Sequence, residues 1–289
     1  KAIGADAITG AIQDAGLENK DIQAAWVGNA AAGLVTGQEC IRGQVVLRNV
    51  GIGQIPIVNV ENACASASTA FNQAAAMVTA GLYDVVLAVG VEKLYDTDKR
   101  KSFAAFSGAV DVEAMTEIMA NLKKNAEKSG AKKATGGAGE NRSMFMDIYA
   151  SAARSHMEAY GTTVEQFAGV SAKNSFHGSL NPRAQFREAL TIEEVLASPM
   201  IAEPLTRPMC SPIGDGAAAV VIVSEKKKKE LGLTNAVSIL ASALHSGWDR
   251  SPGEAGVAEF ATQIAYEETG LGPEDLSVIE LHDASAPAE

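Results

Sequence analysis

The sequence predicts an α/β fold in which helices cover a β-sheet, and three observations indicate it. Short apolar, β-branched runs alternate with helical patterns and lie at residues 24–28, 57–60, 83–92 and 217–223. The run Tyr83–Glu92 is apolar over most of its length, as a strand buried on both faces requires. Finally, Ile12–Ala30 and Tyr266–Ala284 share one pattern, which indicates two similar halves.

Composition and charge exclude several classes of protein. The 289 residues are 47% apolar and 20% charged, which is typical of a soluble globular protein of one large or two ordinary domains. A net charge of −11 argues against a nucleic-acid surface. No apolar run reaches the roughly 20 residues of a membrane span. The three cysteines are too far apart for a zinc site or a disulfide framework, so we expect no metal and a cytoplasmic protein.

Both ends of the chain look cut. It begins at Lys1 without methionine, inside a helical pattern over residues 2–16, and it stops at Glu289 just after a polar cluster. We therefore expect a longer protein.

Residues 95–205 differ in composition from the strands around them. Charged residues, then methionines and lysines, then the helical patterns at 143–160 and 163–175 predict a mostly helical insertion. We expect three parts, which are a first α/β half of residues 1–94 and 206–232, an inserted loop domain of residues 95–205, and the start of a second half at residues 233–289. The glycines within Gly136–Gly139 lack the strand and helix of a phosphate loop, so we interpret them as a hinge.

Cys64 lies where a predicted strand meets a predicted helix. Ile57–Val60 is a β-branched run, the next three residues break it, and small residues from Ala65 onwards open a helix. Backbone N–H groups at a helix N-terminus are unpaired and the macrodipole is positive there. This setting favours the thiolate, which is the reactive form of cysteine. We therefore predict that Cys64 is a nucleophile.

The repeat keeps its register without a gap. At an offset of 254 it pairs Gly16 with Gly270, Leu17 with Leu271, Asp21 with Asp275, Ile22 with Leu276, Val27 with Leu281 and Asn29 with Asp283. The alternative is that any helix, Gly-Leu turn and strand look alike. We favour a duplication, and continuing the offset places the counterpart of Cys64 near position 318, beyond the last residue.

Several stretches in combination resemble the thiolase superfamily. They are Glu61–Ser66, Gly90–Glu92, His156–Thr163, Ser211–Ala219 and Leu281–Ala284. The His282-Asp283 pair is similar to the branch that includes sterol-carrier-protein thiolases and archaeal acetyl-CoA acetyltransferases. The resemblance covers nearly the whole chain. It implies the thiolase fold, with duplicated βαβ halves in a layered α-β-α-β-α core and a mostly helical loop domain inserted in the first half.

The resemblance also implies an activity, which is thiolysis or formation of a 3-oxoacyl-CoA through an acyl-cysteine. Cys64 would attack the keto carbon, and His282 would help hold the water or dipole that stabilises the thioester enolate. Residues 95–205 would carry much of the surface that binds coenzyme A, which is a co-substrate. No metal or redox cofactor is implied. The family's activating histidine and acid/base cysteine would lie beyond Glu289.

Two departures from the family pattern keep other functions open. Ala284 stands where that branch has a cysteine, and Ala65–Ala67 differs from the commonest form, which has a glycine nearby. A related group without the thiolytic cysteine performs retro-aldol cleavage of sterol side-chain CoA esters with a small OB-fold, zinc-ribbon partner subunit. Pro204–Pro212 resembles that group and also thiolases of aromatic acyl-CoAs such as benzoylsuccinyl-CoA.

The presence of Cys64 favours thiolysis. The alternatives are a retro-aldolase (lyase) acting on a β-hydroxyacyl-CoA and a non-catalytic scaffold that binds acyl-CoA or lipid. The small residues around Cys64 and the strand 85–91 also predict a homodimer that pairs near the active site.

The other candidate residues are interpreted as structural. Cys40 falls inside the helical stretch predicted for residues 30–50, and Cys210 precedes a turn. Both are interpreted as small buried hydrophobes. No role is assigned to the remaining histidines, His156, His177 and His245. His282 is the exception because it ends a predicted strand, where catalytic groups collect.

Overall fold

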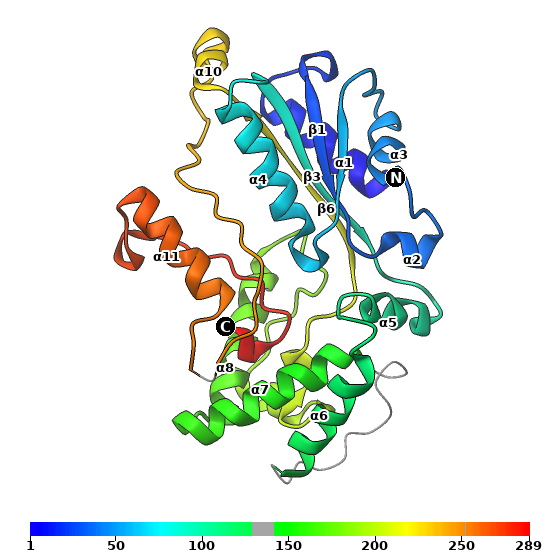
Figure 1. Cartoon of the computed structure of the whole chain (residues 1–289), viewed down its shortest axis with the longest axis vertical. Coiled ribbons are helices and arrows are strands. Elements are labelled where there is room, and N and C mark those ends of the chain that lie inside the picture. Colours follow the sequence, from blue (N-terminus) through cyan, green and yellow to red (C-terminus); the bar gives the residue numbers. More distant parts are fainter. Residues whose placement is uncertain (129–141, 252) are drawn as a thin grey trace. The chain divides into compact units, whose positions relative to one another are not determined.

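A computed structural model describes residues 1–128, 142–251 and 253–289 of the chain (Figure 1). It divides into two compact units, and we define unit 1 as Lys1–Lys93 with Asp215–Ile279 and unit 2 as Leu94–Gly214 with Glu280–Glu289. The glycines interpreted as a hinge, 136–139, lie outside the described residues. Within the three described ranges, no helix has both the length and the apolar character that crossing a membrane requires.

Unit 1 contains a four-stranded sheet. Its strand order is β2 (Ile57–Val60), β1 (Ala24–Gly28), β3 (Val85–Lys93) and β6 (Asp215–Val223). β1 runs parallel to both β2 and β3, whereas β6 is antiparallel to β3. The α/β class predicted from the sequence is confirmed. Because β2, β1 and β3 are parallel, their carboxyl ends meet at one edge of the sheet, and Cys64 follows the end of β2.

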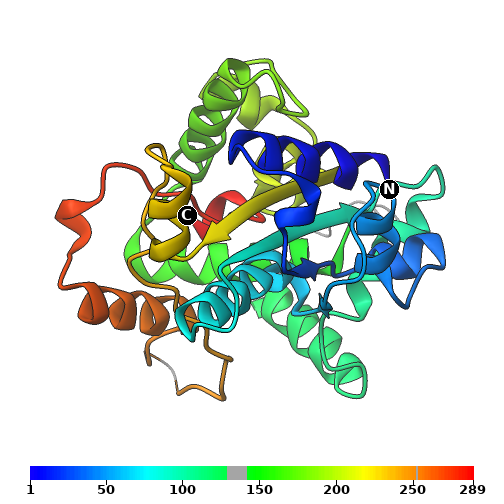
Figure 2. The ribbon, with the colours of Figure 1, turned by 90° about the horizontal axis from the view of Figure 1, so that it is seen from above.

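Helices cover both faces of this sheet. α1 (Ala2–Asp14) packs on one face, where Ile8, Ile12 and Leu47 join the buried strand residues in one core cluster. α4 (Ser66–Thr79) packs on the other, where Ala70 and Ala74 contact Trp26, Val86 and neighbouring residues in a second cluster. Viewed from above, α1 and α4 lie on opposite sides of the strands (Figure 2). The helix α1, the sheet and the helix α4 thus form three layers of the α-β-α-β-α core that the sequence predicts.

The glycine-punctuated helical stretch predicted at residues 30–50 forms two short helices. α2 (Ala32–Thr36) ends at Gly37, whose φ of 81° is left-handed, and α3 (Arg42–Arg48) begins after Ile41, whose φ is 52°. Left-handed backbone at these two positions interrupts the i to i−4 hydrogen bonding that a continuous helix needs. The chain therefore leaves the helical path between Gly37 and Ile41 and resumes it at α3.

The two copies of the repeat share their local structure. α11 (Val257–Thr269) corresponds to α1, and Gly270 ends it with a φ of 68°, as Gly16 follows α1 with a φ of 66°. Short 3₁₀ turns follow at Asn19–Asp21 and at Pro273–Asp275, an offset of 254. This agreement in backbone conformation supports the duplication.

The same hydrogen bond closes both turns. Glu18 N donates to Asp21 Oδ2 at 2.8 Å, and Gly272 N donates to Asp275 Oδ2 at 2.9 Å. The strands that should follow differ. β1 is fully buried, whereas Val278 is 77% and Ile279 63% exposed and neither belongs to a strand. Among the described residues no neighbouring strand pairs with this segment, so its backbone groups have no sheet to join.

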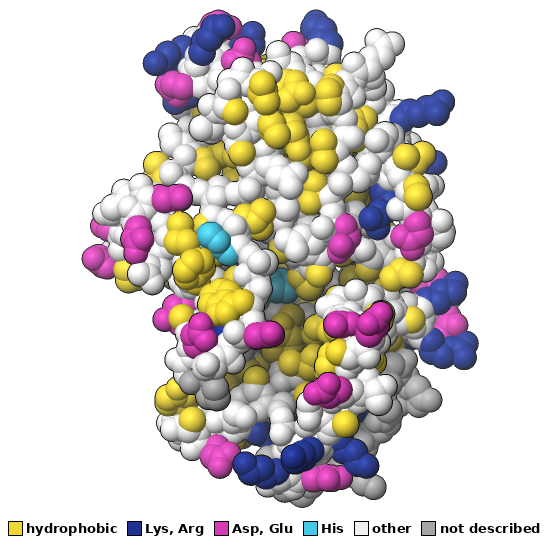
Figure 3. All heavy atoms as spheres, in the orientation of Figure 1, with side chains coloured by type: hydrophobic (Ala, Val, Ile, Leu, Met, Phe, Trp, Pro, Cys, Tyr) yellow, Lys and Arg dark blue, Asp and Glu magenta, His cyan; other side chains and the backbone are white. Residues whose placement is uncertain are grey.

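The remaining helix of unit 1, α10 (Glu225–Leu231), follows β6 and carries the lysines of residues 226–229. Figure 3 shows hydrophobic side chains gathered over α4 and over α11. Among the described residues of α11 no side chain is buried.

Unit 2 is mostly helical, as predicted. Its helices are α5 (Lys99–Ser107), α6 (Met115–Lys128), α7 (Met144–Tyr160), α8 (Val164–Leu180) and α9 (Ile192–Ala197). A two-stranded ribbon of β4 (Met200–Ala202) and β5 (Leu205–Thr206) completes it. α7, α8 and the ribbon share one core around Ala153, Ala168 and Leu205.

Candidate active site

Cys64 occupies a short turn between β2 and α4. Ala63–Ala65 form a single 3₁₀ turn, and α4 begins at the next residue, Ser66. The Cys64 side chain is exposed. The strand, turn and helix that the sequence predicted around this thiol are therefore present, and the first residues of α4 follow the thiol directly.

The turn contains a strained residue. Ala63 has a φ of 44°, in the left-handed region that side chains other than glycine rarely adopt. Such conformations cost about 1–3 kcal/mol each and persist only where the surroundings enforce them. Here two short hydrogen bonds hold the residue, because Ala63 N donates to Glu61 Oε1 at 2.6 Å and Ser66 Oγ donates to Ala63 O at 2.7 Å.

Polar side chains tie the turn to the first two turns of α4. Asn62 N donates to Ser66 Oγ at 2.9 Å, and Asn62 Nδ2 donates to Thr69 Oγ1 at 2.9 Å. Ser66 and Thr69 are only 4% and 5% exposed. The backbone before Cys64 is therefore coupled to the helix after it, and the thiol is held between two ordered segments.

Two glycines bring the neighbouring strands close to the start of α4. A Cβ atom on Gly28, the last residue of β1, would lie 2.4 Å from Ser66 O and 2.6 Å from Ala67 N. A Cβ atom on Gly90 of β3 would lie 2.6 Å from the Cβ of Ala67. The residues that follow Cys64 therefore rest directly on the backbone of both strands.

His282, the second predicted catalytic residue, belongs to unit 2, and Cys64 belongs to unit 1. The His282 side chain is exposed. Its neighbour Asp283 accepts a hydrogen bond of 2.7 Å from Asn174 Nδ2 of α8. Ser285 forms an isolated antiparallel bridge with Cys210, and Ser211 N donates to Ala284 O at 3.2 Å. The His-Asp segment is therefore fastened within unit 2 at Asp283 and at the two residues that follow it.

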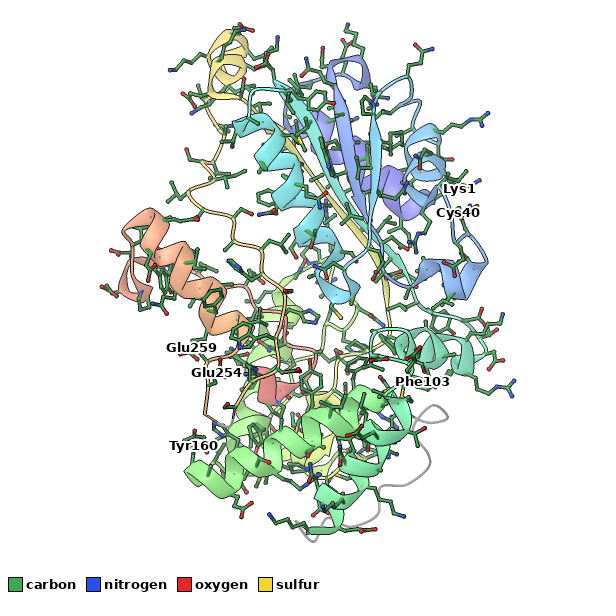
Figure 4. All side chains as sticks on the ribbon, in the orientation of Figure 1. Lys1, Cys40, Phe103, Tyr160, Glu254 and Glu259 are labelled. Atoms are coloured by element: carbon green, nitrogen blue, oxygen red, sulfur yellow. The ribbon has the colours of Figure 1, made fainter. Side chains whose placement is uncertain are left out.

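The three cysteines have different environments. Cys64 and Cys40 are exposed, and Cys40 lies on the segment between α2 and α3 (Figure 4). Cys210 is partly buried, its Sγ lies 3.6 Å from Thr206 O, and burial raises its pKa to about 12. Cys210 is thus the structural residue that the sequence predicted, whereas the exposure of Cys40 shows that its predicted burial is wrong.

This contrast predicts selective labelling. At pH 8, iodoacetamide should alkylate Cys64 and Cys40 but leave Cys210 unmodified in the folded protein, because a buried neutral thiol does not react. Labelling of Cys210 should appear only after unfolding. Peptide mass spectrometry measures all three sites at once, and rapid native labelling of Cys210 would contradict the assignment.

The same raised pKa makes Cys210 destabilising at alkaline pH. The folded chain keeps the Cys210 proton up to a pKa of about 12, whereas the unfolded thiol loses it near its ordinary pKa of 9.0. The unfolded state thus binds fewer protons above that value, and this contribution to stability falls as pH rises from about 9 to about 12.

The fold and the Cys64 turn define an α/β protein with an exposed cysteine at the start of a helix, next to the carboxyl edge of a parallel sheet. Within that class the chain belongs to the thiolase family. The family model for the thiolase N-terminal domain matches residues 1–226.

Relatives with known names support this membership. The chain is 35% identical over 275 residues to the benzoylsuccinyl-CoA thiolase subunit BbsB of Thauera aromatica, covering 93% of this chain and 63% of that protein. It is 36% identical over 279 residues to an acetyl-CoA acetyltransferase of Methanothermobacter thermautotrophicus, covering 95% and 66%. Sterol carrier protein 2 of Rattus norvegicus is 31% identical over 283 residues, with 94% and 49% covered. The chain thus spans from half to two thirds of these proteins.

A solved structure with the same fold is the Ltp2-ChsH2(DUF35) aldolase. The match has a TM-score of 0.67 and 25% sequence identity and covers 99% of this chain and 69% of that one. The thiolase fold predicted from the resemblance is therefore confirmed.

Sequence reasoning did not assign roles to Asn29, Glu92 or Asn174. Asn29 follows the last residue of β1, Glu92 lies near the end of β3, and Asn174 contacts the His-Asp segment. A polar residue at the carboxyl end of a buried strand is the signal that could have found the first two. No sequence pattern places Asn174 beside Asp283, because 109 positions separate them.

Proposed function

We propose that this protein is a thiolase-type acyltransferase that cleaves or forms a 3-oxoacyl-CoA through an acyl-Cys64 intermediate. The observation that carries the proposal is the exposed Cys64 thiol in a strained turn at the start of α4, in a chain that belongs to the thiolase family. Acetyl-CoA acetyltransferases among its relatives support the same activity.

In the proposed reaction, the Cys64 thiolate attacks the C3 carbonyl of the 3-oxoacyl-CoA and forms a C–S bond. The C2–C3 bond then breaks, its electron pair passes to the thioester enolate, and a proton added at C2 completes the departing shortened acyl-CoA, which is acetyl-CoA where C2 carries no substituent. Free CoA, as its thiolate, next attacks the acyl-Cys64 carbonyl and releases the cysteine. Splitting one difficult cleavage into two acyl transfers is the advantage of covalent catalysis.

Two further roles belong to this proposal. His282 helps hold the water or dipole that stabilises the thioester enolate, and this is an oxyanion-hole task. The hydrogen bond from Asn174 to Asp283 supports the role, since it fixes the residue next to His282. The inserted loop domain of residues 95–205 provides much of the surface for coenzyme A, with residues 1–94 and 206–232 as the first thiolase half and 233–289 as the start of the second.

The substrate and the partners are proposed from the relatives. A bulky or aromatic acyl-CoA such as benzoylsuccinyl-CoA is supported by the similarity to the Thauera subunit. The word subunit in that name, together with the DUF35 aldolase, supports a small partner subunit of the OB-fold, zinc-ribbon type. We also propose a homodimer in the cytoplasm, and a monomeric mass in solution would contradict the dimer.

The test is covalent chemistry at Cys64. Incubation with acetyl-CoA or a 3-oxoacyl-CoA should add the acyl mass to the peptide that contains Cys64, and added CoA should remove it. Acylation of Cys40 at the same rate would mean non-specific transfer to an exposed thiol. Absence of any adduct at Cys64, with and without a partner subunit, would contradict the proposal.

A retro-aldolase acting on a β-hydroxyacyl-CoA is the second candidate, and the similarity to the aldolase structure favours it. That reaction needs no acyl-cysteine and no free CoA. Cleavage of a β-hydroxyacyl-CoA in the absence of CoA would establish it, whereas CoA-dependent cleavage of a 3-oxoacyl-CoA would establish thiolysis. Binding of acyl-CoA without either cleavage would indicate a non-catalytic scaffold.

A further inference from the structure

We infer that Glu92 is the positioning residue of the Cys64 site: its carboxylate locks the end of β1 to the end of β3 and thereby places the first turn of α4 under Cys64. Its role in catalysis rests on the proposed acyltransferase function. Its role in placing Cys64 does not, and the two can be tested separately.

The Glu92 carboxylate accepts four hydrogen bonds. Oε2 accepts from Ala30 N at 3.0 Å and from Ala31 N at 3.1 Å, in the segment that leaves β1. Oε1 accepts from Asn29 Nδ2 at 3.1 Å and from its neighbour Lys93 N at 3.0 Å. Hydrogen bonds to a charged acceptor are about twice as strong as neutral ones. One side chain of β3 therefore holds three consecutive residues after β1.

Asn29 extends this connection to β2. Asn29 is 4% exposed, its N–H donates to Val60 O at 3.1 Å, and its Nδ2 also donates to Val91 O. Val60 is the last residue of β2 and lies four positions before Cys64. Glu92, Asn29 and Val60 thus join the carboxyl ends of three adjacent parallel strands at the edge where Cys64 lies.

The ends of β1 and β3, which Glu92 joins, also support the start of α4. Gly28 precedes Asn29, and Gly90 lies two residues before Glu92; both glycines approach Ser66 and Ala67 too closely for a Cβ atom. If the ends of β1 and β3 moved apart, these close contacts would be lost and the first turn of α4 would no longer be supported. The N–H groups and the positive end of the helix would then no longer be held at the thiol.

The test compares the reactivity of two thiols in the full chain. In the variant Glu92→Gln, the amide keeps one oxygen, so its NH₂ group faces either Ala30 N and Ala31 N or Asn29 Nδ2 and Lys93 N, and a donor–donor contact replaces half of the lock. Iodoacetamide should then alkylate Cys64 about threefold more slowly, which corresponds to the loss of a helix-terminus interaction. The rate at Cys40, measured in the same sample by peptide mass spectrometry, should not change.

The matched control is Asp21→Asn. The Asp21 carboxylate also accepts a backbone N–H, from Glu18, but it precedes β1 and lies at the amino end of the strands. This variant should leave both alkylation rates unchanged. An unchanged alkylation rate at Cys64 in Glu92→Gln would overturn the inference. Equal changes in the alkylation rates of Cys64 and Cys40 would also overturn it, because a general loosening of unit 1 affects both thiols alike.

A second measurement keeps the inference falsifiable. If Glu92→Gln does not fold, hydrogen exchange of the unmodified chain tests the inference instead. The Ala30 and Ala31 amides should then exchange together with the Ala65 amide of the Cys64 turn, and rapid independent exchange would refute the lock.

Acylation separates this inference from the proposed function. Where acyl-CoA acylates Cys64 of the unmodified chain, Glu92→Gln should slow that step about tenfold, because misplacement of a nucleophile costs more in an oriented reaction than in alkylation. If acyl-CoA does not acylate the unmodified chain either with or without a partner subunit, the proposed function fails. The alkylation rates still decide the role of Glu92.

Discussion

Replacement of Cys64 by alanine is expected to abolish acyl transfer from acyl-CoA and to lower any thiolysis rate by about a thousandfold or more. Alanine keeps the small volume of the site and removes the Sγ atom to which the acyl group would be attached. Because the side chain is exposed, the fold should tolerate the change. The measurement is the CoA-dependent cleavage of a 3-oxoacyl-CoA, with the acyl adduct followed by mass spectrometry.

Cys40→Ala is the matched control. It removes the other exposed thiol of unit 1 and should leave both the adduct and the rate unchanged. A Cys64→Ala protein that still cleaves a 3-oxoacyl-CoA with CoA would show that the thiolase proposal is wrong. If it instead retained CoA-independent cleavage of a β-hydroxyacyl-CoA, the retro-aldolase would be the function, since that reaction does not need the thiol.

Elements defined by local patterns could be predicted from the sequence. The strands at residues 24–28 and 57–60 and the helix that opens after Cys64 match β1, β2 and α4, because short apolar, β-branched runs and a run of small residues leave clear patterns. The helical pattern predicted at residues 163–175 is a second case: α8 begins at Val164, and Thr163 N donates to Gln166 Oε1 at 2.8 Å just before it. These features depend on neighbours close in sequence.

The second copy of the repeat shows where such patterns stop being sufficient. Its helix, left-handed glycine and 3₁₀ turn form, since each is stabilised by residues within a few positions of it. Its strand does not, although Leu276 and Leu281 match Ile22 and Val27 of the first copy. A strand needs a partner at sheet-forming distance, which the residues that the structure describes do not supply at this place.

The environment of Cys64 could be predicted only in part. The thiol and its helix follow from a continuous stretch of sequence, but the lock at Glu92 joins residues 61 to 63 positions apart. The strained backbone of Ala63 is equally invisible in the sequence, because alanine has no preference for the left-handed region. The parallel register of β1 and β3 is what brings Gly28 opposite Gly90 and hence Asn29 near Glu92.

Gly28→Ala is expected to destabilise unit 1 by about 1–3 kcal/mol, as overpacking of a well-packed core does. The new Cβ atom would lie 2.4 Å from Ser66 O and 2.5 Å from Ser66 C. These are backbone atoms of the α4 start, so no side-chain rotation can relieve the contact and the helix itself must shift. The shift should also slow alkylation of Cys64 relative to Cys40. Urea unfolding and peptide mass spectrometry measure the two effects.

Gly10→Ala is the matched control, and it should change stability in the opposite direction. Gly10 lies inside α1, and a Cβ atom there would meet nothing within 4 Å. The same substitution should therefore stabilise the protein by about 0.5–1 kcal/mol, because alanine is the better helix former. Equal effects of the two substitutions on stability and on the alkylation rate of Cys64 would mean that the contact between β1 and α4 does not set the position of Cys64. Opposite signs would show that the close approach at Gly28 holds the helix on which the thiol depends.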